Sequence, residues 1–511
     1  MDARYTAVLE IGSSKVKGAV ARTDSDGAST LVAMHQVSTN GCVRHGRVQN
    51  IQEVAAAVDE VLRRLENDPA VAPRKIRRVR VALGGRSLKS VHSEAEARFG
   101  EETDITPETV ERLKKEATFS LPADRQVLAV LPRTYKVDNT KVQKAIGCTC
   151  RSIQAKVTVV LADPSNRTNL DRVRMTGGAD TPDGEPVAVE RVYVPRQLAL
   201  AAMALTPSEQ QLGCVLVDMG AETTTVSIHR EGALQSLVTL PMGGRNITID
   251  LANGLKCTEE QAEYIKTNQA SAIADSESMG NDAKEINSYS QARAGEIIAN
   301  VMYRIEAAGF KPSDLPAGII LTGGATGMRR MAELFETQTK MKVRTAPADN
   351  RVRPGTTGAD PITSLEIMAL AAWPAGVDGS DLTALPETAP ARTAEEEDPY
   401  GHDGADDTDA RYGREYHNPR GYDRRRYDTD DDDPDLLDDD PDDDDYEDDR
   451  RRRPGKGAKS KKQYVDPDDD DDDYEEDRGK RKGGRFSGLS NLMKKFGDAV
   501  IGTTGPQDMD D

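Results

Sequence analysis

The sequence predicts an α/β protein of two or more domains, followed by a long polar segment. Three observations predict this. Apolar runs of strand type alternate with segments of helical spacing up to about residue 376, the chain is 511 residues long, and aspartate runs dominate a later stretch. A chain of this length exceeds what one compact core holds, so we expect the alternating part to form more than one domain.

In the first half of the alternating part, apolar runs predict strands, and valine and leucine at helical spacing predict helices. The expected strands are 5–9, 16–21, 78–83, 126–131 and 152–161, the last two among short strands within 84–165. The expected helices are 54–65, 106–117 and 196–205. The second of these begins at the cap Thr106-Pro107. The polar, Gly- and Pro-rich stretch 165–186 is expected to be a loop.

The second half continues the alternation. The expected strands are 213–218, 220–229, 234–240 and 318–321. The expected helices are 247–254, 258–268, 291–308 and 328–339. The run at 213–218 is fully apolar up to its final acid, which is typical of a buried strand with a functional tip. Trp373 and Pro374 are expected to end the last core helix.

Charge and cysteine content narrow the classes of function. The formal net charge is −20, but the acidity belongs to residues 377–479, so the body before it is near neutral. It offers no large basic face, which excludes nucleic acid as a partner. Five scattered cysteines favour a reducing compartment over a disulfide framework. The acidic N-terminus, without an apolar leader or a run of about 20 apolar residues, predicts a cytoplasmic protein.

Residues 377–485 are expected to form a disordered acidic linker. Aspartate runs such as 430–433 and 468–473 bury too little apolar surface to offset the entropy of ordering. The segment is either a plain solvated tether or a spacer that acidic lipids repel. Both interpretations place a flexible connection between the body and the C-terminus.

Three glycine-containing turns each follow an apolar strand. Small residues let backbone N–H groups point at an anion, and hydroxyls and Lys15 add donors and charge. At a Gly-Gly turn, a flat base or ribose can approach the backbone. The turns are Glu10-Ile-Gly12-Ser13-Ser14-Lys15, Asp218-Met-Gly220-Ala-Glu-Thr223-Thr224 and Thr322-Gly323-Gly324-Ala325.

Each turn alone could be a tight turn without function, but their combination predicts two similar halves that face one nucleotide. The first two turns would clasp the phosphates. Glu10 and Asp218 would hold a hydrated Mg²⁺ between them, because magnesium keeps its waters and needs only one or two carboxylates. No GxxxxGK[ST] motif is present, which excludes a P-loop.

The blocks VLEIGSSKV, VLVDMGAETTTVSIH, LPMGGRNITIDLA and AGIILTGGATGM resemble the nucleotide-binding blocks of actin-like ATPases. Their order and spacing resemble the bacterial cell-division family FtsA. RVALGGRSLKSVHSEAEARF, VLPRTYKVD and IQAKVTVV are similar to the extra subdomain of that family. The resemblance implies a two-lobed actin-like fold with an inserted subdomain, ATP with Mg²⁺, self-association into filaments, and binding to the C-terminal tail of FtsZ.

The resemblance also assigns residues and domains. Cofactor-binding positions carried over are Glu10, Gly12, Ser13, Ser14, Lys15, Asp218, Gly220, Thr223, Thr224, Gly243, Gly244, Gly323 and Gly324. The expected domains are 1–83 with 166–206 (1A), 84–165 (1C), 207–240 with 317–376 (2A) and 241–316 (2B). Ala221, Glu222 and Thr225 depart from the family's second block, so we expect at most a slow ATPase in a protein that is primarily a structural anchor.

Residues 486–501 predict an amphipathic helix. Its apolar face and flanking lysines comprise Phe486, Leu489, Leu492, Met493, Lys494, Lys495, Phe496 and Val500. Such a helix can lie in the headgroup region of an anionic bilayer. It could instead dock on the protein's own core, but the long linker favours the membrane. One such helix binds weakly, so polymerisation is expected to strengthen attachment through avidity.

These features together predict an ATP-binding division protein on the cytoplasmic side of the inner membrane, at the division site. It would tether FtsZ and contact other division proteins. The family places the FtsZ contact on 241–316, where we would test helix 291–308 first. Relatives often carry an arginine near Val301. The alternative is a metabolic kinase of the same superfamily, which needs a catalytic aspartate in the cleft; no block of the sequence supplies one.

Overall fold

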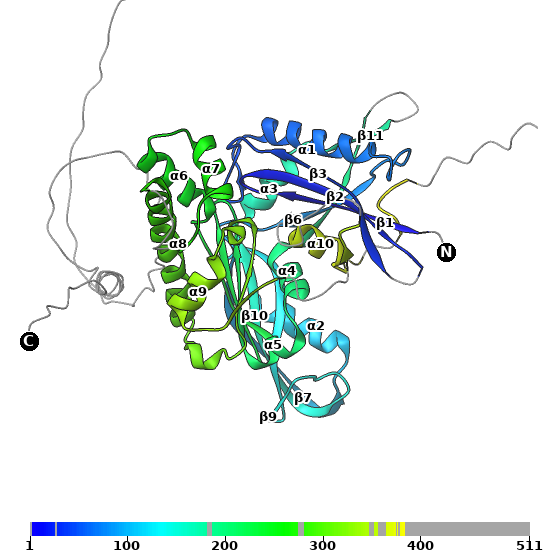
Figure 1. Ribbon diagram of the computed structural model, residues 1–511. Coiled ribbons are helices and arrows are strands. Elements are labelled where there is room, and N and C mark those ends of the chain that lie inside the picture. Colours follow the sequence, from blue (N-terminus) through cyan, green and yellow to red (C-terminus); the bar gives the residue numbers. More distant parts are fainter. Residues whose placement is uncertain are drawn as a thin grey trace, which may run out of the picture. The chain divides into compact units, whose positions relative to one another are not determined.

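The computed structural model describes residues 3–25, 28–180, 186–273, 281–346, 352–355, 364–374, 376 and 379–383. Nearly all of the predicted linker 377–485, and the whole predicted helix 486–501, lie outside these residues. Two large β-sheets, two small two-stranded sheets and the helices packed on them form the described part (Figure 1). None of the helices in these ranges combines the length and apolar character that a bilayer crossing needs.

The first sheet has six strands and carries the N-terminus. Their order is β13 (Glu190–Pro195), β6 (Arg78–Leu83), β1 (Arg4–Ile11), β2 (Lys15–Thr23), β3 (Ser29–Ser38) and β19 (Val352–Arg353). β1 pairs antiparallel with β2 and parallel with β6. The amphipathic helix α1 (Ile51–Glu66) covers one face of this sheet, where its valines and leucines are fully buried.

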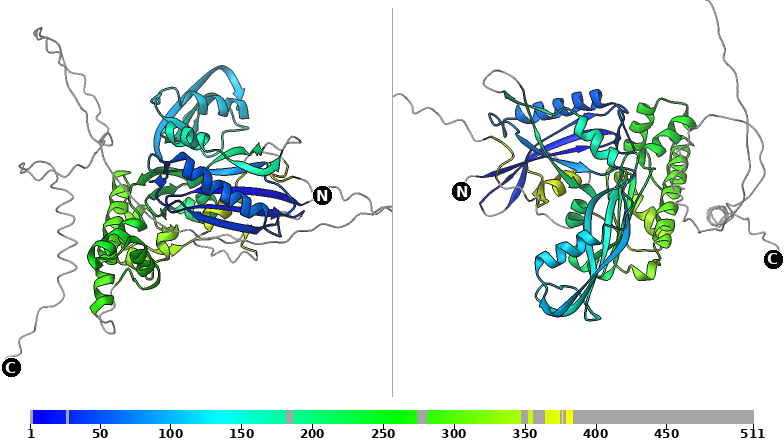
Figure 2. Two further views of the ribbon diagram at one scale, coloured as in Figure 1. Left: turned by 90° about the horizontal axis from the view of Figure 1, so that it is seen from above. Right: turned by 180° about the vertical axis from the view of Figure 1, so that it is seen from behind.

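The second sheet has nine strands. Their order is β18 (Val343–Thr345), β17 (Gly318–Thr322), β14 (Cys214–Met219), β15 (Thr224–Arg230), β16 (Ala233–Leu240), β7 (Lys89–Asp104), β10 (Thr149–Ala162), β8 (Gln126–Val137) and β9 (Thr140–Val142). The helices on its outer face are α6 (Gly244–Leu255), α7 (Glu259–Asn268), α8 (Asn281–Ala307) and α9 (Met331–Thr339). Figure 2 shows these helices together on one side of the sheet.

Two short apolar helices lie between the sheets, α4 (Arg196–Ala204) and α10 (Leu365–Ala372). They share one core with Val8 and Leu31 of the first sheet and with Leu216 and Ile320 of the second. Both helices are rich in alanine, whose small side chain lets the backbones approach closely, and their leucines fill the shared core. This central layer holds the ends of β1 and β14 near each other, and the functional turns begin there.

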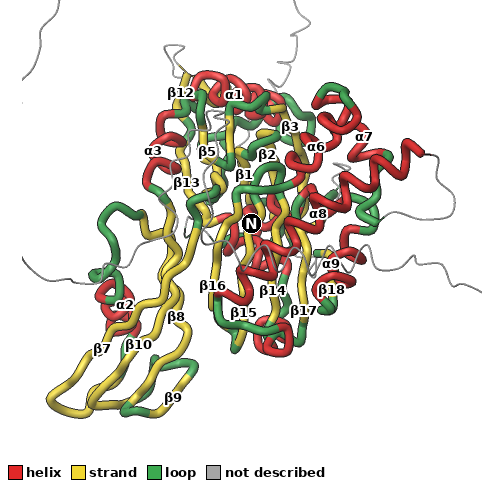
Figure 3. Tube along the Cα trace, turned by 90° about the vertical axis from the view of Figure 1, so that its left-hand side faces the viewer, coloured by secondary structure: helices red, strands yellow, loops and turns green. Residues whose placement is uncertain are grey.

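The inserted segment extends the second sheet, although it follows β6 of the first sheet in sequence. β7 joins β16 at the pair Lys89 and Val238, and the buried Thr158 hydroxyl donates to the carbonyl of Leu234 at 2.8 Å. The helix α2 (Pro107–Glu116) covers β7, β8 and β10 with a core of its own. Figure 3 shows these strands running on from β16.

Most expected elements are present, and the differences have physical reasons. The cap at Thr106 begins α2 as expected. The expected loop 165–186 is wrong in part, because the Asp163 side chain caps α3 (Pro164–Arg172) and β11 (Thr176–Asp180) pairs with β12 (Pro186–Ala188). The strands β7, β8 and β10 are longer than expected, because alternating charged residues continue them into solvent.

Other short elements complete the described part of the chain. They are the hairpin β4 (Val43–Arg44) and β5 (Arg47–Val48), the helix α5 (Pro207–Leu212), and the 3-10 turns η1 (Pro312–Asp314) and η2 (Gly324–Gly327). The β4–β5 hairpin and η2 both reach the region between the sheets that the next section describes. β3 was missed by the sequence analysis, and α8 starts ten residues before its expected beginning at 291.

Candidate functional site

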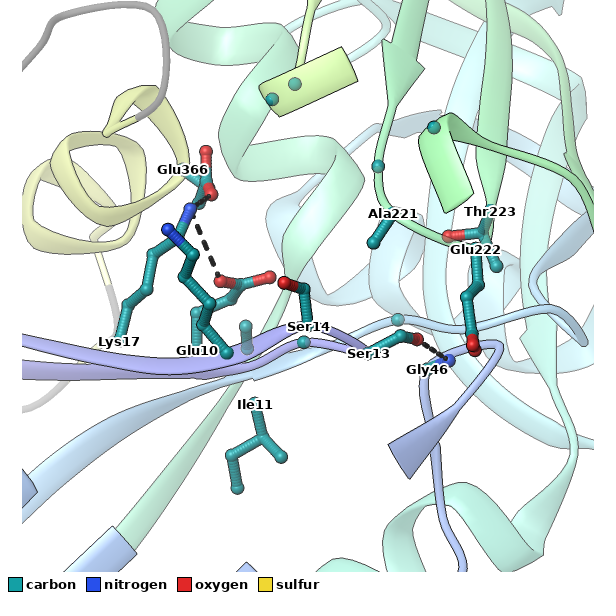
Figure 4. Close-up of a pocket in the computed structure, with 18 of the residues that line it drawn as sticks. Glu10, Ile11, Ser13, Ser14, Lys17, Gly46, Ala221, Glu222, Thr223 and Glu366 are labelled. Carbon is teal, nitrogen blue, oxygen red and sulfur yellow. Dashed lines mark hydrogen bonds and ion pairs between the residues drawn. The ribbon is translucent and has the colours of Figure 1, made fainter. Parts of the chain in front are cut away.

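A cavity of about 380 Å³ lies between the two sheets, where turns from both sides face each other. Ten of the thirteen predicted cofactor-binding residues line it directly, and two of them are Gly323 and Gly324 after β17; the first two turns and α6 supply the other eight. Those eight are Glu10, Gly12, Ser13, Ser14, Lys15, Gly220, Thr223 and Gly244. Figure 4 shows Ser13 and Ser14 on one side and Ala221, Glu222 and Thr223 opposite. The structure therefore brings together turns that are more than 200 positions apart in the chain.

The first turn joins β1 to β2 as a tight hairpin. The amide of Gly12 donates to the carbonyl of Lys15 at 2.9 Å, which closes the turn. The Ser13 hydroxyl accepts a hydrogen bond from the amide of Gly46 at 2.9 Å, so the β4–β5 hairpin holds this side chain in place. The Lys15 side chain is exposed, donates to Gln36 Oε1 at 3.5 Å, and remains available to an anion.

The second turn joins β14 to β15 and is held by the start of α6. The amides of Gly244 and Arg245 donate to the carbonyls of Gly220 and Ala221 at 2.9 and 2.7 Å. Gly243 caps α6, and a Cβ there would lie 2.6 Å from the Gly220 carbonyl oxygen, so only glycine fits. The two predicted glycines therefore hold the second turn in position, and of the two only Gly244 also lines the cavity.

Two predicted residues of the second turn do not line the cavity. Thr224 is fully buried, and its hydroxyl donates to the carbonyl of Met242 at 2.8 Å. Asp218 is 2% exposed and lies at the base of the turn. Its Oδ1 has no hydrogen-bond partner among the described residues, and neither has Oγ1 of its sheet neighbour Thr322. A ligand with donor groups would satisfy both atoms, each of which costs about 1–3 kcal/mol when left unpaired.

The third turn follows β17 and passes very close to Asp218. Gly323 has φ +92°, a conformation that L residues rarely adopt, and a Cβ there would lie 2.7 Å from Asp218 Oδ1. Gly324 has open space around it. Gly323 is therefore required by the backbone, and its missing side chain avoids a clash with the buried Asp218 Oδ1.

A cluster of buried charges lies at the side of the cavity nearest α4 and α10, and all of its members except Asp218 line the cavity. The carboxylates are Glu10, Asp218 and Glu366, and the cations are Lys17 and Arg196. Arg196 Nη1 donates to Asp218 Oδ2 at 2.6 Å, and its Nε lies 3.7 Å from Glu10 Oε1. Lys17 contacts Glu366 and lies 3.8 Å from Glu10, as Figure 4 shows. With three acids and two bases, the cluster has one negative charge in excess.

The pKa values in this cluster diverge because of burial. Burial raises the pKa of Glu10 and of Asp218, and the nearby cations offset only part of this effect. Burial also acts on Glu366, but Lys17 and Arg196 outweigh it and lower the pKa of that carboxyl. Glu366 is thus the most firmly ionised acid of the three. Glu10 and Asp218 gain most from an additional positive group or donor.

Glu222 forms a second link between the two sheets at the same cavity. Its Oε1 accepts hydrogen bonds from Arg44 Nη1 at 3.0 Å and Arg245 Nη1 at 3.2 Å. Its Oε2 accepts one from the amide of His45 at 2.7 Å. The side chain is only 4% exposed. This residue, one of the departures in the second block, joins the β4–β5 hairpin to the start of α6.

The helix α7 lines the cavity with Glu263, Lys266 and Thr267. Lys266 Nζ donates to Glu263 at 2.6 Å and to the Thr248 hydroxyl at 2.9 Å. Burial lowers the pKa of Lys266, and Glu263 only partly opposes this. These polar groups could contact the sugar and base of a nucleotide whose phosphates lie at the first two turns.

Several residues of the cavity were not predicted, although some of them stand in a recognisable sequence pattern. Glu263, Lys266 and Thr267 lie three and four positions apart, on one face of a helix. Arg196 opens a helix of otherwise almost only alanine, leucine and methionine, directly after a strand. Lys17 and Glu366 leave no local signal, because their role depends on the packing of α10 against β2.

Comparison with known proteins identifies the family. A model of "Cell division protein FtsA" matches residues 215–364, and a model of "SHS2 domain inserted in FTSA" matches residues 85–161. Cell division protein FtsA of Porphyromonas gingivalis is 32% identical over 364 residues, which cover 66% of this chain and 72% of that protein. The chain belongs to the FtsA family. The FtsA of Pseudomonas aeruginosa is 29% identical, over 66% of this chain and 81% of its own length.

A solved structure supports the fold. A chain of the PilM-PilN type IV pilus biogenesis complex superposes with a TM-score of 0.50 at 18% identity, over 72% of this chain and 97% of that one. This FtsA-family protein has an actin-like α/β fold with an inserted SHS2 domain, so the predicted fold class is confirmed for the described residues.

The residues of the cleft fit a nucleoside triphosphate. The cavity volume lies within the range of about 300–1,000 Å³ that is usual for ligand sites. Small residues and hydroxyls form both turns, and Lys15 is available to an anion. Asp218 Oδ1 fits water of a hydrated Mg²⁺, whereas direct contact of the metal with Asp218 Oδ2 would displace Arg196. Glu10 and Asp218 are therefore the residues that would hold the metal, through water.

Proposed function

We propose that this FtsA-family protein binds ATP with Mg²⁺ in the cleft and polymerises. The polymer then tethers FtsZ filaments to the cytoplasmic face of the inner membrane while the division septum assembles. The observation that carries the proposal is the cleft itself, because two turns of small residues face each other above a half-satisfied Asp218. Family membership supports the role in division.

ATP is proposed to act by closing the cleft. The phosphates would contact the turn after β1 and the turn after β14, which belong to different sheets. A ligand that touches both sheets favours the arrangement in which they are close. Mg²⁺ supplies charge neutralisation of the phosphates when bound. The cleft thus couples nucleotide binding to a polymer-competent conformation.

The cleft does not favour the alternative function, that of a metabolic kinase. Such an enzyme needs a carboxylate that is free to accept the proton of an acceptor hydroxyl. Within the described ranges, every carboxylate that lines the cavity is paired with a cation: Glu10, Glu222, Glu263 and Glu366. These pairs favour binding over phosphoryl transfer and support a structural role with slow hydrolysis.

The FtsZ tail is proposed to bind on α7 and α8. Tyr264 and Tyr303 are 63% and 47% exposed on these helices, and exposed aromatic side chains are typical anchors of a bound peptide. A shallow hollow beside Tyr264 is lined by Cys257, Gln261 and Ile265. Val301, where relatives often carry an arginine, is fully buried. We therefore expect contact through the tyrosines and not through position 301.

The experiment that tests the proposal is co-sedimentation of FtsZ with anionic lipid vesicles that carry the full chain, with and without ATP. We expect FtsZ to pellet with the vesicles only when the chain is present, and more strongly with ATP. Deletion of 486–501, which lies outside the described residues, should release both proteins. Phe496→Asp should act like the deletion, whereas Asp498→Glu on the polar face should have no effect. Equal pelleting with and without the segment would disprove the anchor.

A second arm tests the FtsZ contact. Tyr264→Ser and Tyr303→Ser should weaken FtsZ recruitment about tenfold each if both are anchors. Glu306→Gln, an exposed change on the same helix, serves as the control and should leave recruitment unchanged. Recruitment that survives both tyrosine changes would place the contact elsewhere.

A further inference from the structure

Arg196 lies between the two carboxylates to which the sequence assigns the metal. Its Nη1 is 2.6 Å from Asp218 Oδ2 and its Nε is 3.7 Å from Glu10 Oε1. The side chain is 18% exposed and lines the cavity. β13 ends at Pro195, so Arg196 opens α4 at the floor of the cleft. A positive group of the chain itself therefore stands between Glu10 and Asp218.

The guanidinium cannot give up its charge. Arginine stays protonated in proteins, and the pKa of Arg196 is raised further by Asp218 and Glu10, although burial opposes this. A divalent cation that approached Glu10 and Asp218 directly would meet this charge at close range in a buried site. Like charges repel strongly where water is excluded. Arg196 therefore opposes direct coordination of a metal by the two acids.

The guanidinium also keeps capacity for a ligand. Arg196 Nε is buried and faces Glu10, so a ligand would contact the exposed 18% of the side chain, which lines the cavity. Lys17, the second cation of the cluster, is engaged with Glu366 and Glu10. The side of the cavity that Arg196 lines also carries the first turn, with Ser14 and Lys15. An arginine that lines the cavity beside such a turn is suited to phosphate oxygens.

We propose that Arg196 is a built-in cation of this cleft, which takes over much of the charge neutralisation that a divalent ion would otherwise supply. Its consequence is that a nucleoside triphosphate binds with little dependence on Mg²⁺. The inference rests on the proposed binding of ATP and deepens it, because it names the group that balances the phosphate charge. It also predicts that the nucleotide-free cleft has little affinity for a divalent ion alone.

A purely structural role makes the opposite prediction. If Arg196 only braces β13 and α4 against β14, it must leave Asp218 when the metal and nucleotide arrive. ATP affinity would then fall steeply on removal of Mg²⁺, as in a site where the metal carries the charge. The two roles therefore differ in the metal dependence of binding, whatever the rate of hydrolysis.

The test is titration of the purified full chain with a fluorescent ATP analogue, in Mg²⁺ and in EDTA. For the wild type we expect the two dissociation constants to differ by less than about threefold. Arg196→Gln should bind at least thirtyfold more weakly in EDTA than in Mg²⁺, and Arg196→Lys should lie between the two. Arg344→Gln removes an arginine paired with Glu209 away from the cavity. It should behave like the wild type.

A second measurement uses the metal alone. Mn²⁺ titration of the nucleotide-free chain, followed by electron paramagnetic resonance, should show no site in the wild type and a new site in Arg196→Gln. A wild-type affinity that falls thirtyfold or more in EDTA would overturn the inference without any variant. Absence of ATP binding in both buffers would instead overturn the proposed function, so the two failures are distinguishable.

Discussion

Asp218 lies near the end of β14 and Glu222 lies four positions later, in the turn that follows the strand; both are almost completely buried. Each contacts an arginine that belongs to the first sheet or its connections, so each links the two sheets. They differ in how many of their carboxylate oxygens accept hydrogen bonds. Both oxygens of Glu222 accept hydrogen bonds, from Arg44, Arg245 and the amide of His45. Asp218 uses only Oδ2, and its Oδ1 has no partner in the part of the chain that the structure describes.

This difference assigns a structural role to one of the two carboxylates and a ligand-binding role to the other. A buried carboxylate with every lone pair engaged stabilises the fold and has nothing left for a ligand. A buried carboxylate with an open oxygen beside a cavity costs stability, which a ligand can restore. We therefore infer that Glu222 holds the sheets together and that Asp218 serves the nucleotide. The predictions below test the two assignments separately.

The largest expected effect concerns the space above Asp218. Gly323→Ala places a methyl group 2.7 Å from Asp218 Oδ1 and 2.4 Å from the Met219 carbonyl, in a backbone conformation that disfavours L residues. Strain and overpacking of this kind cost about 1–3 kcal/mol each. We expect the free energy of unfolding to fall by about 3 kcal/mol or more in chemical denaturation. Gly324→Ala, which meets open space, is the matched control and should change stability by less than about 1 kcal/mol.

A smaller loss of stability is expected when the hydrogen bonds of Glu222 to Arg44 and Arg245 are weakened. Glu222→Gln keeps the shape but removes the charge that faces Arg44 and Arg245. The nucleotide-free protein should lose about 1–3 kcal/mol of unfolding free energy. Glu259→Gln also removes a partner of Arg245, but Glu259 is 48% exposed, so about 0.5 kcal/mol or less is expected. Equal losses in the two variants would show that Glu222 is not the link described here.

The smallest effect concerns a buried base without a counter-charge. His229 lies on β15, after the loop, and burial lowers its pKa to about 4. Because the folded value lies below the unfolded value near 6.5, stability is lost as pH falls from about 6.5 towards 4. Between pH 7.5 and 5.5 the loss is about 1 kcal/mol. His229→Gln should remove this slope in thermal or chemical unfolding, whereas His92→Gln should keep it; an unchanged slope in His229→Gln would refute the assignment.

Sequence patterns predicted the fold well where a structural feature depends on a few consecutive residues. The three turns, the apolar run of β14 and the cap at Thr106 are each contained in a few residues, and the structure places them as expected. The loop expected at 165–186 failed because α3 carries almost no apolar periodicity and depends on the cap at Asp163.

The charged side of the cleft could not be predicted in the same way. Lys17 and Glu366 are 349 positions apart and meet only because α10 packs against β2. Gly243 and Thr224 were assigned to the ligand by resemblance, but one caps α6 and the other bonds to Met242. Local motifs show which turns face a ligand. Tertiary packing decides which neighbouring charges share the cavity with them.

The most direct test of the account is the affinity of ATP for the purified chain and for Asp218→Ala, measured by equilibrium titration with Mg²⁺ present. We expect binding by the wild type and a loss of at least a hundredfold in Asp218→Ala. Glu222→Gln should bind within about fivefold of the wild type. Unchanged affinity in Asp218→Ala, or no binding of ATP by the wild type, would contradict the assignment of the cleft.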